Sequence, residues 1–406
     1  MTDFRPSEEK ELAEIVADAA ARKQSLEIVA GGSKRGYGRP VKANHLLDVS
    51  RIAGIVKHEA AELILTARPG TSLAAIKAEL AAKGQMLAFE PPGWQSLFET
   101  NAEPTLGGVL ACNIGGPRRV RAGAPRDYFL GFSAVNGRGE IWKAGGKVVK
   151  NVTGFDVSKL LAGSFGTLSV LTEITLKVMP RPESQCTILL PALADEIAIA
   201  TMAKALNTPF EVSGVAHLPP AAARRSSVAA VAQAPSAVTA LRIEGPAPSV
   251  AFRAEALEGL FGYGERLDSA ASAQFWEEIG EAQRLLPKGA RVVWRLCPTP
   301  SQGAVAAGAI MARLPSSEAF FDWGGGLVWL SLDADEAGTD AGAGVVRGAM
   351  KSCGGHATLM VAPAATRKKT AVFEPAPGPL AALTARVKAG FDPYGVFNPG
   401  RMQEGL

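Results

Sequence analysis

The sequence has little of several residue types that mark common classes of site. Its 406 residues include only four cysteines, far apart and without a C-x-x-C pair. Iron–sulfur clusters and structural zinc sites need closely spaced thiolate ligands, so neither is expected. No run of about 18 apolar residues occurs, so no membrane-spanning helix is predicted. We interpret the cysteines as small buried side chains; they are Cys112, Cys186, Cys297 and Cys353.

Signals for export and for nucleic-acid binding are also missing. The first residues, MTDFRPSEEKELAEIV, contain no basic segment followed by an apolar one, so no secretory signal is predicted. The formal net charge of +4 and the pI of about 8.8 are too weakly basic to indicate a nucleic-acid partner. We therefore expect a cytoplasmic protein that binds no nucleic acid.

Three familiar motifs do not occur. The sequence has no G-x-G-x-x-G after a strand and no G-x-x-x-x-G-K-[ST], which disfavours Rossmann and P-loop nucleotide sites. It also lacks G-x-S-x-G, the nucleophile turn of many hydrolases.

The pattern of apolar residues predicts mixed helix and strand in the first part of the chain. Ser7 is predicted to cap a helix, and Thr71 or Ser72 another that stops at Gly84. The Asn136-Gly137 pair is predicted to turn a β-hairpin. Strands are expected at 25–30, 63–70 and 168–178.

Pro180 and Pro182 mark a predicted domain boundary, after which the sequence becomes rich in alanine. Residues 192–355 combine short strands with helical patterns. The segments 218–236 and 333–344 are interpreted as loops. A last helix is expected to stop at Gly390.

Three glycine-rich loops carry the strongest functional signal. Residues 30–42 and 104–126 each contain four cations and no carboxylate, and residues 163–168 read GSFGTL. Glycine permits close approach of the backbone to a ligand, and successive N–H groups bind anions. A tight turn with solvated cations is the alternative for any one loop. We predict a diphosphate site at Gly31, Gly32, Ser33 and Lys34.

The order AGGSKRG, PTLGGVLACNIGG, GFDVSKLLAGSFGTLSVLTE and terminal FDPYGVFNPGR resembles the vanillyl-alcohol-oxidase-type (PCMH-type) FAD-binding family. The resemblance implies an α+β fold in which residues 1–180 form a PCMH-type FAD-binding domain of two α/β subdomains. Residues 181–375 would form a smaller cap domain of antiparallel sheet and helices. Residues 376–406 would return to the FAD domain.

The resemblance also implies the residues that hold FAD. The diphosphate would lie against Gly31, Gly32, Ser33, Lys34, Arg35 and Gly36. The flavin and ribityl chain would lie along Thr105, Gly107, Gly108, Asn113, Gly115 and Gly116, with Gly163, Gly166, Thr167 and Val170 also on the cofactor. Asn398, Pro399 and Gly400 would close the site.

We expect the FAD to be non-covalent. Covalent relatives attach flavin through His or Cys near these loops, whereas this sequence has Gly123 where many relatives have Tyr. His45 and His58 fall outside the matching loops. Cys112 is the remaining possible tether.

The machinery for oxidising a hydroxy acid is sparse. Such dehydrogenases of this family carry a cluster rich in His and Glu, whereas only His217 and His356 lie beyond residue 180. Of these two, His356 is the better candidate base, because the preceding Gly-Gly permits close approach to a ligand; no other catalytic residue is assigned. This pattern resembles FAD-binding accessory subunits of glycolate oxidase complexes, and no metal is expected in the chain itself.

Such a subunit would act beside a catalytic FAD subunit and an iron–sulfur subunit. The complex would oxidise glycolate, a small 2-hydroxy acid, to glyoxylate, and would reach the inner membrane only through partners. Two alternatives remain: a self-sufficient FAD-linked, D-lactate-like dehydrogenase, and a non-catalytic assembly subunit. Four arginines would contact FAD, substrate or a partner, or form a solvated face: Arg118, Arg119, Arg121 and Arg126.

Overall fold

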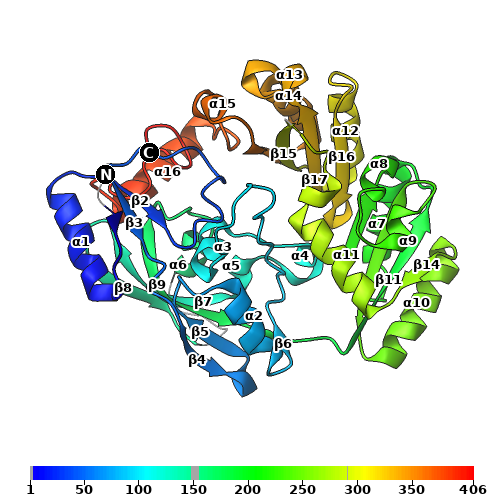
Figure 1. Ribbon diagram of the computed structural model, residues 1–406, viewed down its shortest axis with the longest axis horizontal. Helices are drawn as coiled ribbons and strands as arrows, with labels where there is room; N and C mark the ends of the chain where they lie inside the picture. The colour runs from blue at the N-terminus through cyan, green and yellow to red at the C-terminus, as the bar shows by residue number, and fades with distance from the viewer. Residues whose placement is uncertain (1–2, 148–154, 290) are drawn as a thin grey trace. The chain divides into compact units, whose positions relative to one another are not determined.

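The chain divides into two units that are each discontinuous in sequence (Figure 1). The computed structural model describes residues 3–147, 155–289 and 291–406; Gly154, at the start of the third family motif, lies outside them. Unit 1 comprises Met1–Ile114, Ala124–Arg181 and Pro375–Leu406, and unit 2 comprises Gly115–Gly123 and Pro182–Glu374. The proline-flanked segment predicted as a boundary therefore lies at a junction between units.

Unit 1 contains two main sheets. The first is parallel, in the order β1 (Asp3–Phe4), β3 (His45–Asp48), β2 (Leu26–Val29). The second is antiparallel, in the order β4 (Ile55–Glu59), β5 (Ile64–Ala67), β9 (Ser169–Lys177), β7 (Phe129–Asn136), β8 (Ile141–Gly145). A short ribbon pairs β10 (Met179–Pro180) with β6 (Gln85–Met86). The helices are α1 (Glu9–Ala21), α2 (Leu73–Ala81), α3 (Leu106–Cys112), α5 (Pro125–Tyr128), α6 (Val157–Leu161) and α16 (Gly378–Phe391).

One core of unit 1 joins the parallel sheet to segments distant in sequence. The apolar face of α1 supplies Leu12 and Val16, which are fully buried with Leu26 and Leu47 of the sheet. Val396 and Phe397, from the C-terminal segment, belong to the same cluster. The last residues of the chain are thus part of the structure that supports β2.

Three local predictions for unit 1 need correction. Ser7 does not cap α1, because its hydroxyl bonds the Glu11 carboxylate and the helix begins at Glu9. The hairpin turns through residues 137–139 rather than through a two-residue Asn-Gly turn, and the positive φ of 80° is at Gly139. Helix α16 continues past Gly390 to Phe391, where Asp392 ends it.

Unit 2 is built on one eight-stranded antiparallel sheet. Its order is β14 (Glu265–Leu267), β11 (Ser184–Pro191), β13 (Val238–Gly245), β12 (Gly214–Leu218), β16 (Glu318–Asp322), β17 (Leu327–Asp333), β15 (Arg291–Cys297), β18 (His356–Val361). The longer helices are α7 (Asp195–Leu206), α10 (Ala247–Phe261), α11 (Ser269–Glu281), α12 (Gly303–Met311) and α14 (Ala343–Cys353). Shorter helices are α4 (Arg119–Ala122), α8 (Pro220–Ala223), α9 (Ala229–Ala232), α13 (Ala334–Ala337) and α15 (Ala364–Lys369).

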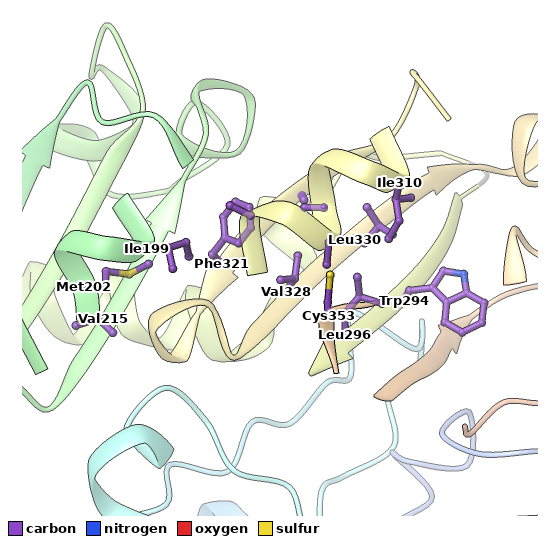
Figure 2. Packing of buried hydrophobic residues seen from close by; sticks show 14 of the residues in the cluster. Ile199, Met202, Val215, Trp294, Leu296, Ile310, Phe321, Val328, Leu330 and Cys353 are labelled. Atoms are coloured by element: carbon purple, nitrogen blue, oxygen red, sulfur yellow. The ribbon is translucent and has the colours of Figure 1, made fainter. Parts of the chain in front are cut away.

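The main core of unit 2 lies between this sheet and helices α7, α10, α12 and α14. Figure 2 shows Trp294, Leu296 and Leu330 of the strands beside Ile310 and Cys353 of the helices. Because strand side chains alternate in direction, every second residue of β15 faces away from this core.

The segments predicted as loops contain short helices. Residues 218–236 include α8 and α9, and residues 333–344 begin with α13, which Asp333 caps through its side chain. Among the described residues, no helix has the length and apolar character needed to cross a bilayer.

Candidate cofactor-binding site

A cavity of about 880 Å³, part of it open to solvent, lies within unit 1. Its lining comes from the ends of β2 and β3, the first turns of α3, the start of β9 and the C-terminal segment. The apolar wall contains Ile28, Val29, Ala30, Val49, Pro69, Ala111, Leu161, Phe165, Val170 and Leu171. The remaining lining residues are Gly32, Ser33, Lys34, Arg35, Thr105, Gly107, Gly108, Cys112, Ser164, Gly166, Ser169, Asn398 and Arg401.

Two glycines shape the loop that follows β2. Gly32 has a φ of 89°, a conformation that only glycine adopts readily, and only Ala102 would approach a Cβ placed there. A Cβ at Gly31 would instead lie 1.8 Å from the Glu103 carbonyl oxygen. Gly31 is therefore required for packing, whereas Gly32 presents its backbone to the cavity.

The lining of the cavity includes the cationic side chains of Lys34 and Arg35, which follow Gly32 in the same loop. Lys34 is only 6% exposed, and its ammonium donates to the carbonyl of Gly93 at 2.8 Å and to the Ser33 hydroxyl at 3.1 Å. Arg35 forms a two-point ion pair with Glu27, and the hydrogen bond to that carboxylate raises the pKa of Arg35. The charge of Arg35 is thus largely neutralised within the protein.

Arg401 differs from Arg35 in its partners. Its guanidinium donates to the carbonyl oxygens of Arg39, Lys34 and Arg35 at 3.1–3.2 Å. Within the described parts of the chain it forms no ion pair with a carboxylate. Burial lowers the pKa of Arg401, which measures the cost of keeping this charge away from water. A bound anion in the cavity would offset that cost.

Asn398 connects opposite walls of the cavity. Its side-chain oxygen accepts from the amide of Ile28 at 2.8 Å, and its side-chain nitrogen donates to the carbonyl of Phe165 at 2.8 Å. Gly166 follows directly with a φ of 66°, and a Cβ there would come within 3.0 Å of the Asn398 nitrogen. The close approach of these two segments explains the glycine.

A buried ion pair holds Asn398 in place. The Lys388 ammonium bonds Asp392 Oδ2 at 2.5 Å and also donates to the carbonyls of Thr167 and Phe397. The Asp392 carboxylate accepts from the amides of Val396 and Phe397. These bonds tie the end of α16 and the residues before Asn398 to the loop that carries Thr167.

The structure brings ten of the predicted cofactor residues to the cavity lining and leaves eight outside it. The ten are Gly32, Ser33, Lys34, Arg35, Thr105, Gly107, Gly108, Gly166, Val170 and Asn398. Gly31, Gly36, Asn113, Gly163, Thr167 and Pro399 do not line it, and Gly115 and Gly116 belong to unit 2. The cofactor contacts of all eighteen residues remain predictions.

Several residues outside the lining have visible structural tasks. A Cβ at Gly36 would meet the ring of Phe98 at 2.8 Å. Asn113 ends α3 with a φ of 51°, and its side chain accepts from the amide of Arg126. A Cβ at Gly163 would contact Asn113. These residues position the loops around the cavity.

Arg401 and the residues of the apolar wall other than Val170 were not predicted. Arg401 is the arginine of FDPYGVFNPGR, so the motif itself carried the signal. Residues such as Val49 and Leu161 are ordinary apolar residues in sequence, and nothing local distinguishes them from core positions.

Cys112 lies in the cavity wall, where burial raises its pKa to about 11. Its thiol is therefore protonated at neutral pH and is a poor nucleophile. The described lining contains no histidine. His58 lies elsewhere in unit 1, between Glu79 and Gln85, at 2.9 and 2.8 Å.

The two histidines of unit 2 have different surroundings. His217 is fully buried and bonds Thr239 at 2.8 Å and Asp195 at 3.1 Å, as expected of a structural residue. His356 is exposed at the start of β18. The preceding glycine approaches backbone rather than a ligand, because a Cβ at Gly355 would lie 1.8 Å from the Cys297 carbonyl oxygen.

Most of the four arginines of the second loop have protein partners. Arg118 forms a two-point ion pair with Glu244 at 2.6 and 3.0 Å, and Arg121 pairs with Glu211 at 3.2 Å. Arg119 stacks on a tryptophan ring of unit 2. Arg126, in unit 1, is exposed.

The cavity fits the chemistry of FAD. An apolar wall suits the flat isoalloxazine ring, and the backbone at Gly32 with the cations Lys34 and Arg401 suits a diphosphate. The requirement for glycine at position 32, where the backbone has a positive φ and little stands nearby, agrees with a ligand lying against it.

Comparisons with known proteins agree with this assignment. Residues 3–145 match a family described as an FAD binding domain. Over 391 residues the chain is 35% identical to glycolate oxidase subunit GlcE of Escherichia coli K12, covering 96% of each protein. It is 33% identical over 150 residues to glycolate oxidase subunit GlcD of Bacillus subtilis, covering 37% of this chain and 30% of GlcD.

Solved structures of the same fold are also known. A p-cresol methylhydroxylase with bound substrate has a TM-score of 0.72 and 13% identity, over 100% of this chain and 89% of that structure. A 4-ethylphenol oxidase from Gulosibacter chungangensis has a TM-score of 0.72 and 14% identity, over 99% and 88%. At such low identity these similarities concern the fold, and they confirm the predicted PCMH-type α+β architecture.

Proposed function

Because the chain belongs to the family of FAD-binding flavoproteins that includes glycolate oxidase subunit GlcE, we propose that it is the FAD-binding accessory subunit of a glycolate-oxidising complex. In this proposal it acts beside a catalytic FAD subunit and an iron–sulfur subunit. The overall reaction is the oxidation of glycolate to glyoxylate. The match to GlcE, which covers 96% of each protein, supports a similar role.

The observation that carries the proposal is the charge pattern of the unit 1 cavity. Lys34, the Arg401 guanidinium and the open backbone at Gly32 all line the cavity, and many of the other lining residues are apolar. Arg401 bonds carbonyl oxygens and no carboxylate in the described parts of the chain. We propose that the cations and the Gly32 loop hold the FAD diphosphate. Asn398 keeps both walls at the right separation for the ring. When bound, FAD supplies a carrier that accepts and passes on electrons.

The lining of this cavity favours an accessory role over independent catalysis. Removal of a hydroxyl proton needs a base within hydrogen-bond reach. None of the described lining residues is a His, Asp or Glu, and His217 is already bonded to Asp195 and Thr239. The chain's own groups therefore bind the cofactor and exclude water without supplying a base from the cavity wall.

We also propose that FAD is held without a covalent bond. Cys112 is the cysteine in the described lining, and its raised pKa of about 11 keeps it as a thiol. Acid precipitation of the purified protein should therefore release all of its flavin into the supernatant. Flavin that stays in the pellet, and is lost from it in a C112S variant, would contradict this part.

Purification of the tagged chain from its native cell tests the accessory role. We expect it to bring down one larger flavoprotein and one cysteine-rich iron–sulfur protein, in a complex that oxidises glycolate. The isolated chain should be yellow, and its flavin should not bleach when glycolate or D-lactate is added without air. Bleaching of the isolated chain would indicate a self-sufficient dehydrogenase. A colourless chain that takes up no added FAD would indicate an assembly subunit.

A further inference from the structure

A cysteine of unit 2 lies among groups that favour its thiolate. Cys297 ends β15 and is half-buried. The preceding residue, Leu296, packs in the helix-covered core, so strand alternation directs Cys297 to the opposite face of the sheet. Arg295 lies two residues earlier on the same face, and its Nη1 donates to Cys297 Sγ at 3.3 Å.

His356 meets this thiol from the neighbouring strand. It is directly opposite Cys297 in the antiparallel pairing of β15 and β18. The glycine at 355 lets β18 begin tightly against the Cys297 carbonyl. Because His356 is exposed, solvent and small solutes reach the imidazole that adjoins the sulfur.

Two guanidinium groups are held beside the same site. Arg119 and Arg295 each stack on the ring of Trp323, 5.0 Å from its centroid, and the Trp323 indole donates to the Gly116 carbonyl at 3.1 Å. Arg295 forms no ion pair with a carboxylate in the described chain, and its buried Nε has no hydrogen-bond partner there. Its charge is therefore available to an anion at Cys297.

We propose that Cys297 is a reactive thiolate that hydrogen peroxide oxidises to a sulfenate. In this step a sulfur lone pair attacks one peroxide oxygen, an S–O bond forms and the O–O bond breaks. Sulfur loses two electrons, and the peroxide is reduced to water. The proton of the attacked oxygen passes to the departing hydroxide, a transfer that His356 is placed to carry. Arg295 then bonds the sulfenate in place of the thiolate.

The electrostatic balance agrees with this geometry. Burial raises the pKa of Cys297, but Arg295, His356 and Arg119 together lower it below its usual value. Burial raises the pKa of Cys186 and, to about 11, that of Cys112. Cys186 and Cys112 therefore serve as less reactive comparison thiols within the same chain.

The product is expected to remain a sulfenate rather than become an internal disulfide. Cys353 is buried in the helix-covered core, whereas Cys297 faces the other side of the sheet. A disulfide needs the two Cβ atoms about 4 Å apart and directed toward each other. External thiols or a sulfenate-specific reagent would therefore be the partners.

Alkylation kinetics on the full chain test the thiolate. Limiting iodoacetamide is added over a neutral-to-alkaline pH series, and mass spectrometry gives the rate at each cysteine. We expect Cys297 to react faster than half-buried Cys186 at neutral pH, by about threefold for each pH unit between their pKa values. The midpoint of its pH profile should also be lower.

Variants identify the groups responsible. H356A and R295M should both move the Cys297 midpoint upward. R291M is the matched control, since Arg291 lies on the same strand and face but bonds the Ser316 carbonyl. Because His356 is exposed, H356A remains informative if R295M fails to fold. Equal rates at Cys297 and Cys186, or an unchanged midpoint in H356A, would overturn the proposal.

The peroxide step is tested separately. Hydrogen peroxide followed by dimedone should label Cys297, with no label at that position in C297S and little on Cys186. Rapid alkylation without any dimedone adduct on Cys297 would overturn the assignment of peroxide as the reactant.

Discussion

Asn398 accepts a hydrogen bond from the amide of Ile28 across 370 positions of sequence, at a distance of 2.8 Å. The same side chain donates to the carbonyl of Phe165. Beside it, Leu26 exchanges backbone hydrogen bonds with Val396 and Asn398, so the C-terminal segment runs next to β2 like a short additional strand. Both walls of the cavity in unit 1 therefore depend on one amide side chain.

Replacing Asn398 by Ala should weaken both the fold and flavin retention. Losing two buried hydrogen bonds leaves an amide and a carbonyl without partners, a cost of about 1–3 kcal/mol for each group. The N398D variant keeps an acceptor for the Ile28 amide but loses the donor to Phe165. Its stability and flavin content should therefore lie between those of N398A and wild type. Thermal melting with and without FAD, and flavin per chain, are the measurements. Equal flavin content in all three proteins would contradict this role.

Replacing Arg401 by Met should reduce the affinity for FAD by about 10- to 100-fold, the equivalent of one charge-assisted contact. R401K keeps the charge but not the planar fork of donors, so its affinity should be intermediate. R22M is the control for loss of charge, because Arg22 is exposed at the C-terminal end of α1. Fluorescence titration with FAD and with riboflavin, which lacks the diphosphate, separates phosphate binding from ring binding. A loss of affinity that is as large for riboflavin as for FAD would show that Arg401 acts only on loop structure.

Replacing Gly32 by Val should abolish FAD retention. The φ of 89° is strained for any β-branched residue, and the new side chain would occupy the backbone surface that faces the cavity. Gly54 provides the matched control, because its φ is 114° with nothing within 4 Å and it does not line the cavity. G54V should carry similar strain and keep its flavin. If G32V retains FAD as well as G54V does, another loop holds the diphosphate.

Replacing Glu244 by Gln should destabilise unit 2 by about 3–5 kcal/mol, because Arg118 and fully buried Arg242 would lose their carboxylate. Burial raises the pKa of Glu244, but the two arginines lower it by more than burial raises it. The pKa of Glu244 is therefore below the usual 4.5.

This shift also predicts a pH dependence for Glu244. The folded state holds the proton less tightly than the unfolded state, so the stabilisation is complete above about pH 4.5 and is lost as pH falls through the folded pKa. Urea unfolding over a pH series should show a shallower acid loss in E244Q than in wild type. Parallel acid profiles for the two proteins would rule out this contribution.

Much of the local structure could be predicted, because the order of polar and apolar residues within a segment indicates whether that segment forms a strand. The strand expected at 168–178 corresponds to β9, in which Glu173 and Lys177 are half-buried and the other residues are buried. The glycine-rich segment 30–42 after β2 was likewise identified from composition alone, and five of its residues line the cavity.

What could not be predicted depends on contacts between distant residues. The partners of Arg401 are carbonyl groups more than 360 positions away, and the sequence does not show that the C-terminal segment would reach them. The family resemblance assigned Gly115 and Gly116 to the cofactor, and nothing local in the sequence shows that these residues group with unit 2. The role of His217 depends on Asp195, which strand and helix geometry bring together.

The nine residues Gly115–Gly123 belong to unit 2 although the chain on either side of them belongs to unit 1. The polypeptide thus passes between the units at 114/115, 123/124, 181/182 and 374/375. A single protease cut at any one of these points would not separate the two units, because the polypeptide still connects them at the other three. Expressing residues 182–374 alone would omit the segment Gly115–Gly123, which carries Arg118. Glu244 would then lose one of the two arginines that pair with it. To produce unit 2 by itself, the nine residues Gly115–Gly123 should therefore be joined to residues 182–374 through a linker or a circular permutation. Simple truncation would leave them out.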